Sequence, residues 1–142
     1  MARHLSFEDA RRVLDAALER AVAIGQPMNV AVVDDGGHLL AFGRQDGAIL
    51  GSIDIAINKA RTSALMKMST EELGKAAAPD GPLYGIEVTN GGLVIFGGGI
   101  LLTDGGQAVL GAIGVSAGSV TQDIEVAQSG VDALSGRSKQ PS

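Results

Sequence analysis

The sequence predicts a single layered α+β domain whose sheet is at least partly antiparallel. Three observations predict this class. Helical periodicity stands near both ends of the chain, a short β-hairpin follows the first helical segment, and a glycine-dense, strand-rich segment runs from Gly91 to Gly118. The 142 residues fit one domain, and we expect its ordered core over about residues 5–134.

The first helix is predicted over residues 7–24. Ser6 and Asp9 have capping-box spacing, with Asp in place of the usual Glu, and Leu5 precedes them at the staple position. Gly25 is a natural C-terminal stop. Between these ends, apolar residues recur at helical spacing: Val13, Leu14, Ala17, Leu18, Ala21 and Val22.

A β-hairpin is predicted next. Residues 28–33 form a β-branched run, residues 34–37 supply turn chemistry that tolerates positive φ, and residues 38–42 form the returning strand. Strands joined in this way are antiparallel, which argues against a doubly wound fold.

Two helices follow the hairpin. Ser52 is expected to cap a helix over roughly residues 53–68, where apolar residues recur every three or four positions. Ser69 and Glu72 form another capping-box pattern, which predicts a short helix near residues 70–77.

The second half alternates turns and strands. Residues 78–85 contain two prolines and two glycines and are predicted to form a loop. A turn at residues 90–92 precedes a strand over residues 93–96. The triplet Gly97–Gly99 breaks that strand, and residues 100–103 continue it or begin another.

The chain closes with a hairpin and a helix. A turn at residues 104–106 leads into a strand over residues 108–115. Ser119 and Gln122 then begin the last helix, and residues 135–142 are expected to be a frayed polar tail. The buried stripe of that helix is predicted to comprise Ile124, Ala127, Val131 and Leu134.

Composition excludes several classes of partner and site. A net charge of −5, with no basic run and 3% aromatic residues, argues against nucleic acid. The absence of cysteine excludes disulfides, thiolate metal sites and a cysteine nucleophile. Neither a signal-peptide core nor a run of about 20 apolar residues is present, so we expect no membrane association and a cytosolic location.

The order and spacing of several motifs resemble the GlcG/HbpS-like family, which also supplies the C-terminal domain of PduO-type proteins. The resemblance covers nearly the whole chain, from Leu5 to Leu134. The matching stretches are Val-Val-Asp-Asp-Gly-Gly-His at 32–38, Arg-Gln-Asp-Gly-Ala at 44–48, Asn-Lys-Ala-Arg-Thr at 58–62, Gly-Gly-Gly at 97–99, Gly-Ala-Ile-Gly-Val-Ser at 111–116, Gln-Asp at 122–123 and Ala127.

The resemblance implies a profilin-like antiparallel sheet of about five strands flanked by helices. It also implies a homo-oligomer with a ligand site near subunit contacts, and haem-linked or corrinoid-linked roles for some members. The chain departs from the family pattern in two places. Ile100 and Leu101 stand where a proline is usual, and Ala117 stands where a second glycine is usual.

The charged candidates for ligand binding are Arg44, Asp46 and Lys59. Arg44 and Asp46 follow the second strand, where Arg could clamp a carboxylate or propionate, or the two could form a structural pair. Lys59, on the second helix, could have a lowered pKa and act as a base or anion anchor. Alternatively, its ammonium group reaches solvent or pairs with a carboxylate.

Glycine and serine residues form a second group of candidates. Gly97, Gly98 and Gly99 could present backbone N–H groups to an anion, or permit a bulge or a tight strand contact. Ser116 lies near the N-terminus of the last helix, whose N–H groups suit an anion, and Ser119 is expected to cap that helix. Asp123 and Glu125 favour the helix dipole without an active role.

His38 opens a strand beside a turn and could bind haem iron or transfer a proton, or it could simply be an exposed polar residue. His4 is expected to be solvated. No spacing of histidines or carboxylates predicts a dedicated metal site. Aromatic walls for haem could come only from Phe7, Phe42, Phe96 and Tyr84.

Two functions follow from these candidates. The first is a cytosolic binding or accessory protein for haem or another small, anionic, largely apolar ligand. Arg44, Asp46, Lys59 and the 97–99 glycines would form the polar part of its site. The second is a small catabolic enzyme that performs proton transfer, such as isomerisation or deamination, on a carboxylate intermediate. Arg44 would bind that substrate, with Lys59 or Asp46 as the base.

Overall fold

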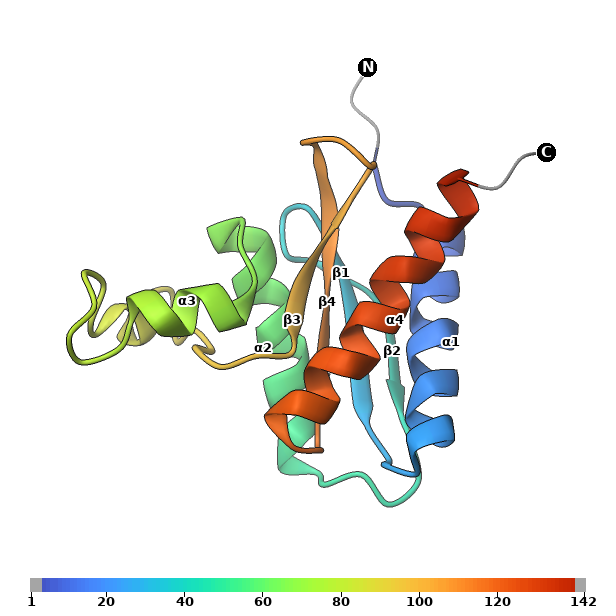
Figure 1. Cartoon of the computed structure of the whole chain (residues 1–142), viewed down its shortest axis with the longest axis horizontal. Helices are drawn as coiled ribbons and strands as arrows, with labels where there is room; N and C mark the ends of the chain where they lie inside the picture. The colour runs from blue at the N-terminus through green and yellow to red at the C-terminus, as the bar shows by residue number, and fades with distance from the viewer. Residues whose placement is uncertain (1–3, 140–142) are drawn as a thin grey trace.

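The computed structural model describes the backbone of residues 4–139 and the side chains of residues 4–135. The elements follow the predicted order (Figure 1). They are α1 (Phe7–Ile24), β1 (Asn29–Asp34), β2 (Leu39–Arg44), α2 (Gly51–Met66), α3 (Thr70–Ala76), the 3₁₀ turn η1 (Ile86–Val88), β3 (Gly99–Thr103), β4 (Val109–Ser116) and α4 (Val120–Lys139).

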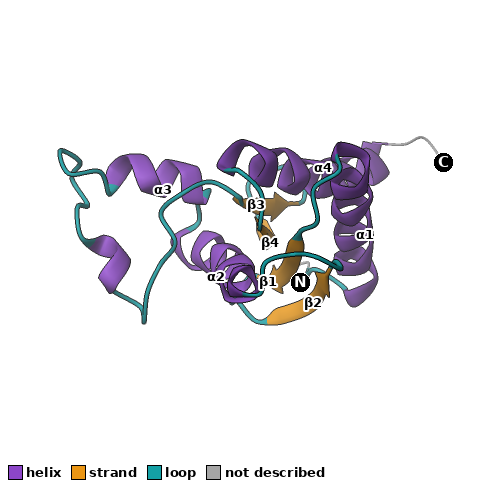
Figure 2. Cartoon of the chain, turned by 90° about the horizontal axis from the view of Figure 1, so that it is seen from below, coloured by secondary structure: helices purple, strands orange, loops and turns teal. Residues whose placement is uncertain are grey.

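The sheet is antiparallel throughout and lies between two helical layers. Its strand order is β2-β1-β4-β3, so β2 and β3 form the edges. Helices α1 and α4 lie side by side on one face, and α2 covers the other (Figures 1 and 2). The predicted α+β class is therefore confirmed, with four strands in the described residues where about five were expected.

A projection extends away from these layers. It comprises α3 and the following segment up to Phe96, which we call the arm (residues 70–96; Figures 1 and 2). The returning segment of the arm is tied to α2 by Arg61, which donates to the carbonyl oxygens of Asn90 (2.6 Å) and Gly92 (3.4 Å).

The two faces of the sheet are packed differently. The face under α1 and α4 carries large apolar side chains, including Val30, Val32 and Ile113. The central strands carry smaller side chains on the face under α2, namely Ala31, Val33 and Ala112, with Phe42 and Leu101 on the edge strands. Small residues permit α2 to approach the sheet closely. A Cβ at Gly114 would lie 2.1 Å from the carbonyl oxygen of Ala56, so only glycine fits there.

The predicted ends of α1 are confirmed. The Ser6 hydroxyl accepts the Asp9 amide at 3.0 Å, and Gly25 ends the helix with φ = 72°. The Ser69 cap of α3, the β1–β2 turn and the loop after α3 are also confirmed.

The strand predicted over residues 93–96 is wrong. The amide of Leu93 donates to the carbonyl oxygen of Glu87, and the amide of Val94 donates to Thr62 Oγ1, so neither joins the sheet. The segment is apolar because Leu93 and Val94 are buried between α3 and α2. Apolar runs of this length do not distinguish a strand from a buried loop.

The predicted strands of the two hairpins are shifted or extended by one or two residues, and three helix ends also differ from the predictions. Helix α2 begins at Gly51 without a side-chain cap, so Ser52 lies inside its first turn. It ends at Met66, because Lys67 adopts a left-handed conformation with φ = 57°. Helix α4 continues through Lys139, so residues 135–139 are helical rather than a frayed tail; residues 140–142 lie outside the described residues.

None of the helices in residues 4–139 combines the length and apolar character needed to cross a membrane.

We expect Gly114→Ala to destabilise the fold by about 1–3 kcal/mol, because the added methyl group must push α2 away from β4. The matched control is Gly51→Ala in the first turn of α2, where a Cβ meets nothing within 4 Å. That change should be neutral or stabilise by up to about 1 kcal/mol. Urea unfolding of both variants measures the difference, and equal stabilities would contradict the proposed close contact.

Candidate functional site

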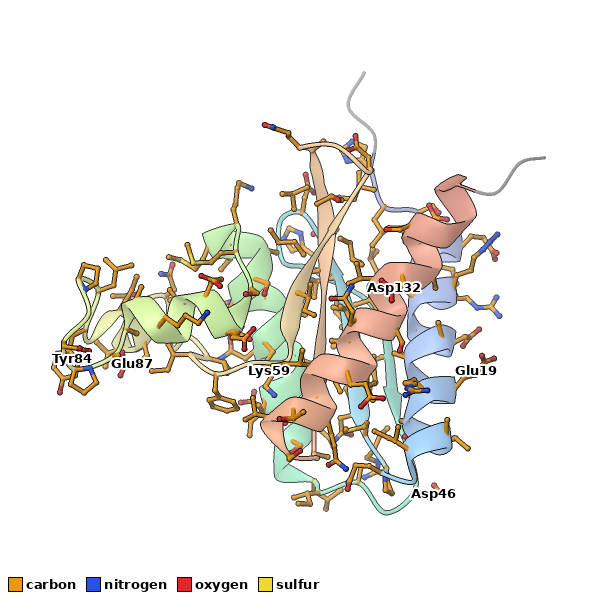
Figure 3. The ribbon with its side chains drawn as sticks, viewed as in Figure 1. Glu19, Asp46, Lys59, Tyr84, Glu87 and Asp132 are labelled. Carbon is orange, nitrogen blue, oxygen red and sulfur yellow. The ribbon has the colours of Figure 1, made fainter. Side chains whose placement is uncertain are left out.

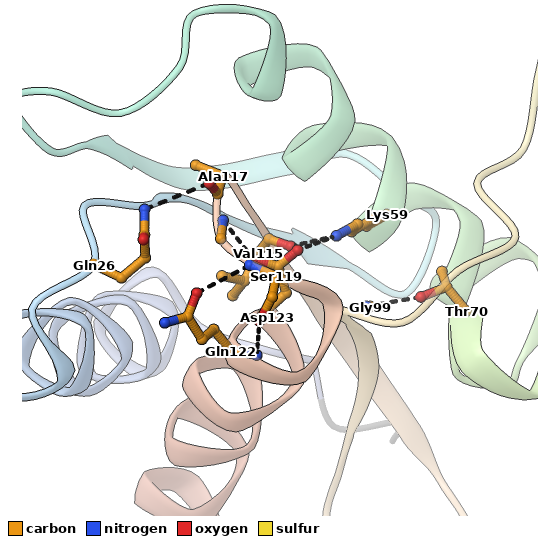
Figure 4. Close-up of polar contacts among 10 residues, drawn as sticks. Gln26, Lys59, Thr70, Gly99, Val115, Ala117, Ser119, Gln122 and Asp123 are labelled. Atoms are coloured by element: carbon orange, nitrogen blue, oxygen red, sulfur yellow. Dashed lines mark hydrogen bonds and ion pairs between the residues drawn. The ribbon is translucent and has the colours of Figure 1, made fainter.

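A buried ion pair lies where α2, α4 and the beginning of β3 meet (Figure 4). The Nζ of Lys59 is 2.9 Å from Oδ2 of Asp123 and donates to the carbonyl oxygen of Val115 at 2.8 Å. The Phe96 ring lies over the ammonium group, 4.9 Å from Nζ to the ring centroid. Both charged side chains are buried, with 0% of Lys59 and 3% of Asp123 exposed.

The pair joins the two helical layers across the sheet. Lys59 belongs to α2 on one face and Asp123 to α4 on the other, and the two meet beside the first residue of the edge strand β3 (Figures 3 and 4). The other carboxylate oxygen, Oδ1 of Asp123, accepts the amide of Gly118 at 3.1 Å. The carboxylate therefore holds both Lys59 and the turn that begins α4.

The glycine triplet leaves room for this ion pair. A Cβ at Gly98 would lie 2.6 Å from Lys59 Nζ, and one at Gly99 would lie 2.5 Å from the Lys59 carbonyl oxygen. At Gly97 a Cβ would meet Ile124 at 2.6 Å. The Gly99 amide donates to Thr70 Oγ1 at 2.9 Å. Of the two readings of the triplet, tight packing of the strand accounts for these contacts.

Burial disfavours the charged form of both side chains of the pair. Desolvation lowers the pKa of Lys59 below its usual range, and the hydrogen bond and charge of Asp123 offset part of that shift. Desolvation also raises the pKa of Asp123, against the opposing effects of Lys59 and the Gly118 amide.

The pairing of Lys59 with a carboxylate was one of the two alternatives for this residue, and it is confirmed. Its partner was not predicted, since Asp123 was assigned only to the helix dipole. A signal was present in the sequence. Asp123 stands four residues before Ala127 and eleven before Leu134, which places a carboxylate on the buried stripe of α4.

The predicted cap of α4 is confirmed, whereas Glu125, assigned to the helix dipole, lies beyond the first turn and instead forms an ion pair that was not predicted. Ser119 and Gln122 form a reciprocal capping box, with distances of 3.2 and 3.0 Å. Glu125 lies on the surface, where Arg20 Nε of α1 donates to it at 2.8 Å.

Arg44 and Asp46 are not brought to the Lys59 region within the chain. Arg44 is the last residue of β2, one edge of the sheet, and Lys59 lies beside β3, the other edge. Three strand spacings separate these edges, about 14 Å. Arg44 is exposed and forms no ion pair with Asp46 or any other described residue. Asp46 lines an open pocket of about 310 Å³ at the C-terminal end of α1, together with Gln26 and Pro27.

Ser116 is the last residue of β4 and lies beside Asn29 of β1. Both side chains are buried. The departures Ile100 and Leu101 lie in β3, where Ile100 packs against the α1–α4 side and Leu101 against the α2 side.

His38 lies at the opposite end of β1, in the turn before β2. Its Nδ1 is 3.2 Å from Oδ1 of Asp34, and its side chain is 81% exposed. Slight desolvation acts to raise the pKa of Asp34, but hydrogen bonds from the amides of His38 and Gly36 and the nearby imidazole together lower it. The carboxylate therefore stays ionised and orients the ring, and Nε2 makes no hydrogen bond to any described residue.

Two exposed leucines lie near the turn that carries His38. Leu39 follows it directly, and Leu65 of α2 lies 3.7 Å from the position of a Cβ at Gly37. Both leucines are exposed. No group of three or more metal-ligating side chains occurs in the described part of the chain.

Comparison with known proteins gives a consistent result. A family model described as haem-degrading protein HbpS-like matches residues 5–132. The chain is 39% identical to a 15.0 kDa protein from the dhaT–dhaS intergenic region of Citrobacter freundii over 92% of each chain. It is also 39% identical to the corrinoid adenosyltransferase PduO of Salmonella typhimurium, over 92% of this chain but only 39% of that protein.

Solved structures show the same arrangement of elements. The Klebsiella pneumoniae protein ORFY superimposes with a TM-score of 0.91 at 35% identity, covering 95% of this chain and 93% of that one. The PduOC:haem complex superimposes with a TM-score of 0.87 at 38% identity, covering 92% and 95% of the two chains.

We expect Lys59→Met to destabilise the fold by about 3–5 kcal/mol at neutral pH, because it leaves Asp123 buried without its cation. The double variant Lys59→Met/Asp123→Leu should be more stable than the sum of the single changes predicts. Lys75→Met removes an exposed pair with Glu72 and should change stability by less than about 0.5 kcal/mol. Chemical denaturation of Lys59→Met, Asp123→Leu, the double variant and Lys75→Met measures these energies.

The loss in Lys59→Met should depend on pH. Burial raises the pKa of Asp123 in the folded state above its ordinary value of 3.8. The protonated carboxyl therefore favours the folded state below pH 3.8, and this contribution is lost as the pH rises through the raised pKa. The free energy of unfolding of Lys59→Met should be closest to that of the wild type in acid, and the difference between the two should grow as the pH rises. A difference independent of pH would contradict an unpaired Asp123.

Proposed function

Because the chain belongs to the HbpS-like family, whose model spans residues 5–132, we propose that it is a haem-binding protein in which His38 is the axial ligand to the iron. A solved relative, PduOC, holds haem. Haem supplies an iron centre that accepts an axial nitrogen ligand, and the residues around His38 fit that requirement.

The geometry of His38 is the observation on which this proposal rests. A histidine that binds a metal usually donates its other ring nitrogen to a carboxylate, which fixes the tautomer and orients the ring. Asp34 provides that carboxylate at Nδ1, and the turn holds it in place, because its Oδ1 also accepts the amides of Gly36 and His38, each at 2.9 Å. Nε2 faces solvent and is available to iron. His4, the other histidine, has no such carboxylate.

The surroundings of His38 suit one face of a haem. Leu39 and Leu65 offer exposed apolar side chains beside the turn that carries His38, and Arg61 of α2 lies next to the same turn, 3.5 Å from the Cβ position of Gly37. The pockets of about 310 and 450 Å³ lie elsewhere, beside α1 and α4. A haem bound to His38 over Leu39 and Leu65 would therefore be covered on one side only.

We further propose that a second copy of the chain supplies the missing cover, so that the active form is a homo-oligomer. The arm supports this. It projects from the layers and exposes Leu83, Tyr84 and Val88 near its tip (Figure 3). Exposed apolar side chains grouped on a projection are typical of an interface between subunits.

The enzymatic alternative requires Lys59 or Asp46 to act as a base. Lys59 is fully buried and held by Asp123 and the Val115 carbonyl, and Asp46 lies at the opposite edge of the sheet from it. The positions of these residues therefore favour haem binding over the enzymatic function.

Titration with haemin should give a saturable, shifted Soret band for the wild-type protein. His38→Ala should abolish the shift, because it removes the axial nitrogen, and His4→Ala should leave it unchanged. Asp34→Asn should weaken binding by about 10–100-fold, because the ring loses the carboxylate that orients it. An unchanged spectrum in His38→Ala would reject His38 as the ligand, even if haem still binds.

We expect the wild-type protein to sediment as an assembly larger than the 14.4 kDa chain. Val88→Lys should dissociate it, because a charge replaces a side chain that is 81% exposed on the arm. Val22→Lys on α1, where the wild-type side chain is 73% exposed, is the matched control and should leave the mass unchanged. Dissociation by Val22→Lys alone would place the interface on α1 and contradict the role of the arm. Analytical ultracentrifugation measures the masses.

A further inference from the structure

Three polar side chains share one row of the sheet at the end where α2 begins. Asn29 of β1 pairs with Arg44 of β2 on one side and with Ser116 of β4 on the other. Side chains in one such row point to the same face, and neighbours stand about 5 Å apart. Asn29 stands two residues before Ala31 in β1, so both side chains point to the same face, and Ala31 packs on the α2 side. All three side chains therefore lie on the α2 face.

The start of α2 lies over this row. The Ala56 carbonyl contacts the Cβ position of Gly114. Four residues back along α2 and two residues forward along β4 are both steps of about 6 Å, which places Ser52 level with Ser116. The Asn29 side chain touches the same turn, because its Nδ2 donates to the Ile49 carbonyl oxygen at 3.1 Å.

The positive end of α2 is left without a side-chain cap. Its N-cap residue is Leu50, which makes no side-chain hydrogen bond to the helix. The acid of the first turn, Asp54, is exposed and stands two positions after Ser52, about 200° around the helix from the row. The amides of Ser52 and Ile53 donate to the carbonyl oxygens of Ile49 and Leu50, each at 3.1 Å, so the amides of residues 49–51 are the ones left to an anion at this helix end.

A buried acceptor in the row has no donor. Asn29 is 0% exposed, and its Oδ1 has no hydrogen-bond partner; in the described residues only Ser63 Oγ and Glu87 Oε1 share that condition. Such an atom is costly, because it has lost water without gaining a donor. The hydroxyl groups of Ser52 and Ser116 also form no hydrogen bond with any described residue, and Arg44 forms no ion pair.

We propose that this row is a binding site for a small carboxylate that also carries a hydrogen-bond donor. The Arg44 guanidinium, the α2 N-terminus and the two serine hydroxyls bind the carboxylate, and the donor of the ligand satisfies Asn29 Oδ1. The site is independent of the proposed haem site, because His38 lies at the other end of β1, about 17 Å away along the strand.

Lactate and propionate test the proposal as a matched pair, because they differ only in the hydroxyl group. Titration followed by ¹⁵N-resolved NMR should show saturable lactate-dependent shifts in the Asn29 side-chain amide and in the backbone amides of residues 49–52. Asn29 Oδ1 is covered in the free chain, so binding must move this turn. Propionate should bind at least about 10-fold more weakly, because it leaves Asn29 Oδ1 without a donor. Equal affinities, or no saturable shift at these residues, would overturn the proposal.

Arg44→Gln should weaken lactate binding by about 10-fold or more while the melting temperature stays unchanged, because the side chain is exposed and unpaired. Arg12→Gln, an exposed arginine of α1 on the other side of the sheet, removes the same charge and should leave lactate affinity unchanged. Equal weakening in both variants would indicate attraction by net charge alone and would reject the site. Haemin binding by Arg44→Gln should stay intact, which distinguishes this site from the one at His38.

Discussion

The buried contact between Lys59 and Asp123 fixes how the two helical layers meet. Each helix packs on its own face of the sheet through apolar burial, and the close backbone approach at Gly114 sets the position of α2 on its face. The ion pair links the two helices directly, because buried Lys59 is satisfied by Asp123 and the Val115 carbonyl oxygen, and buried Asp123 by Lys59 and the Gly118 amide. A displacement of either helix by one residue would leave an unpaired charge in the core.

This constraint explains the distribution of glycine in the second half of the chain. Glycine at positions 98 and 99 makes room for the Lys59 ammonium and backbone, and Gly114 makes room for the backbone of α2. The glycine density that suggested a ligand pocket therefore serves close packing between elements. The positions that we propose for ligands are instead the two ends of β1: the exposed turn that carries His38, and the row where Arg44, Asn29 and Ser116 lie below the start of α2.

Local patterns in the sequence were sufficient for elements whose ends are determined by nearby residues. Ser6, Gly25, Ser69 and Ser119 cap helices through contacts within a few residues, and all four were predicted. The segment 93–96 was predicted wrongly because its amides bond to Glu87 and Thr62, which no local pattern reveals. The site shows the same limit. Lys59 and Gly97–Gly99 were selected individually, but Asp123, the carboxylate that pairs with Lys59, is 64 residues from it along the chain.

Ala117 shows how far this long-range constraint overrides local preference. It stands where the resemblance leads us to expect glycine, and its φ is 131°, a conformation that costs a residue with a Cβ of the order of 1–3 kcal/mol. The turn is held from both sides: Gly118 donates to the Asp123 carboxylate, and the Val115 carbonyl accepts from Lys59. The Ala117 carbonyl oxygen also accepts Gln26 Nε2 at 3.4 Å. The backbone between these two anchors has to make the turn whether or not residue 117 is glycine. The conformation is therefore imposed by the ion pair, and the alanine is strained because the charges on either side of it are satisfied.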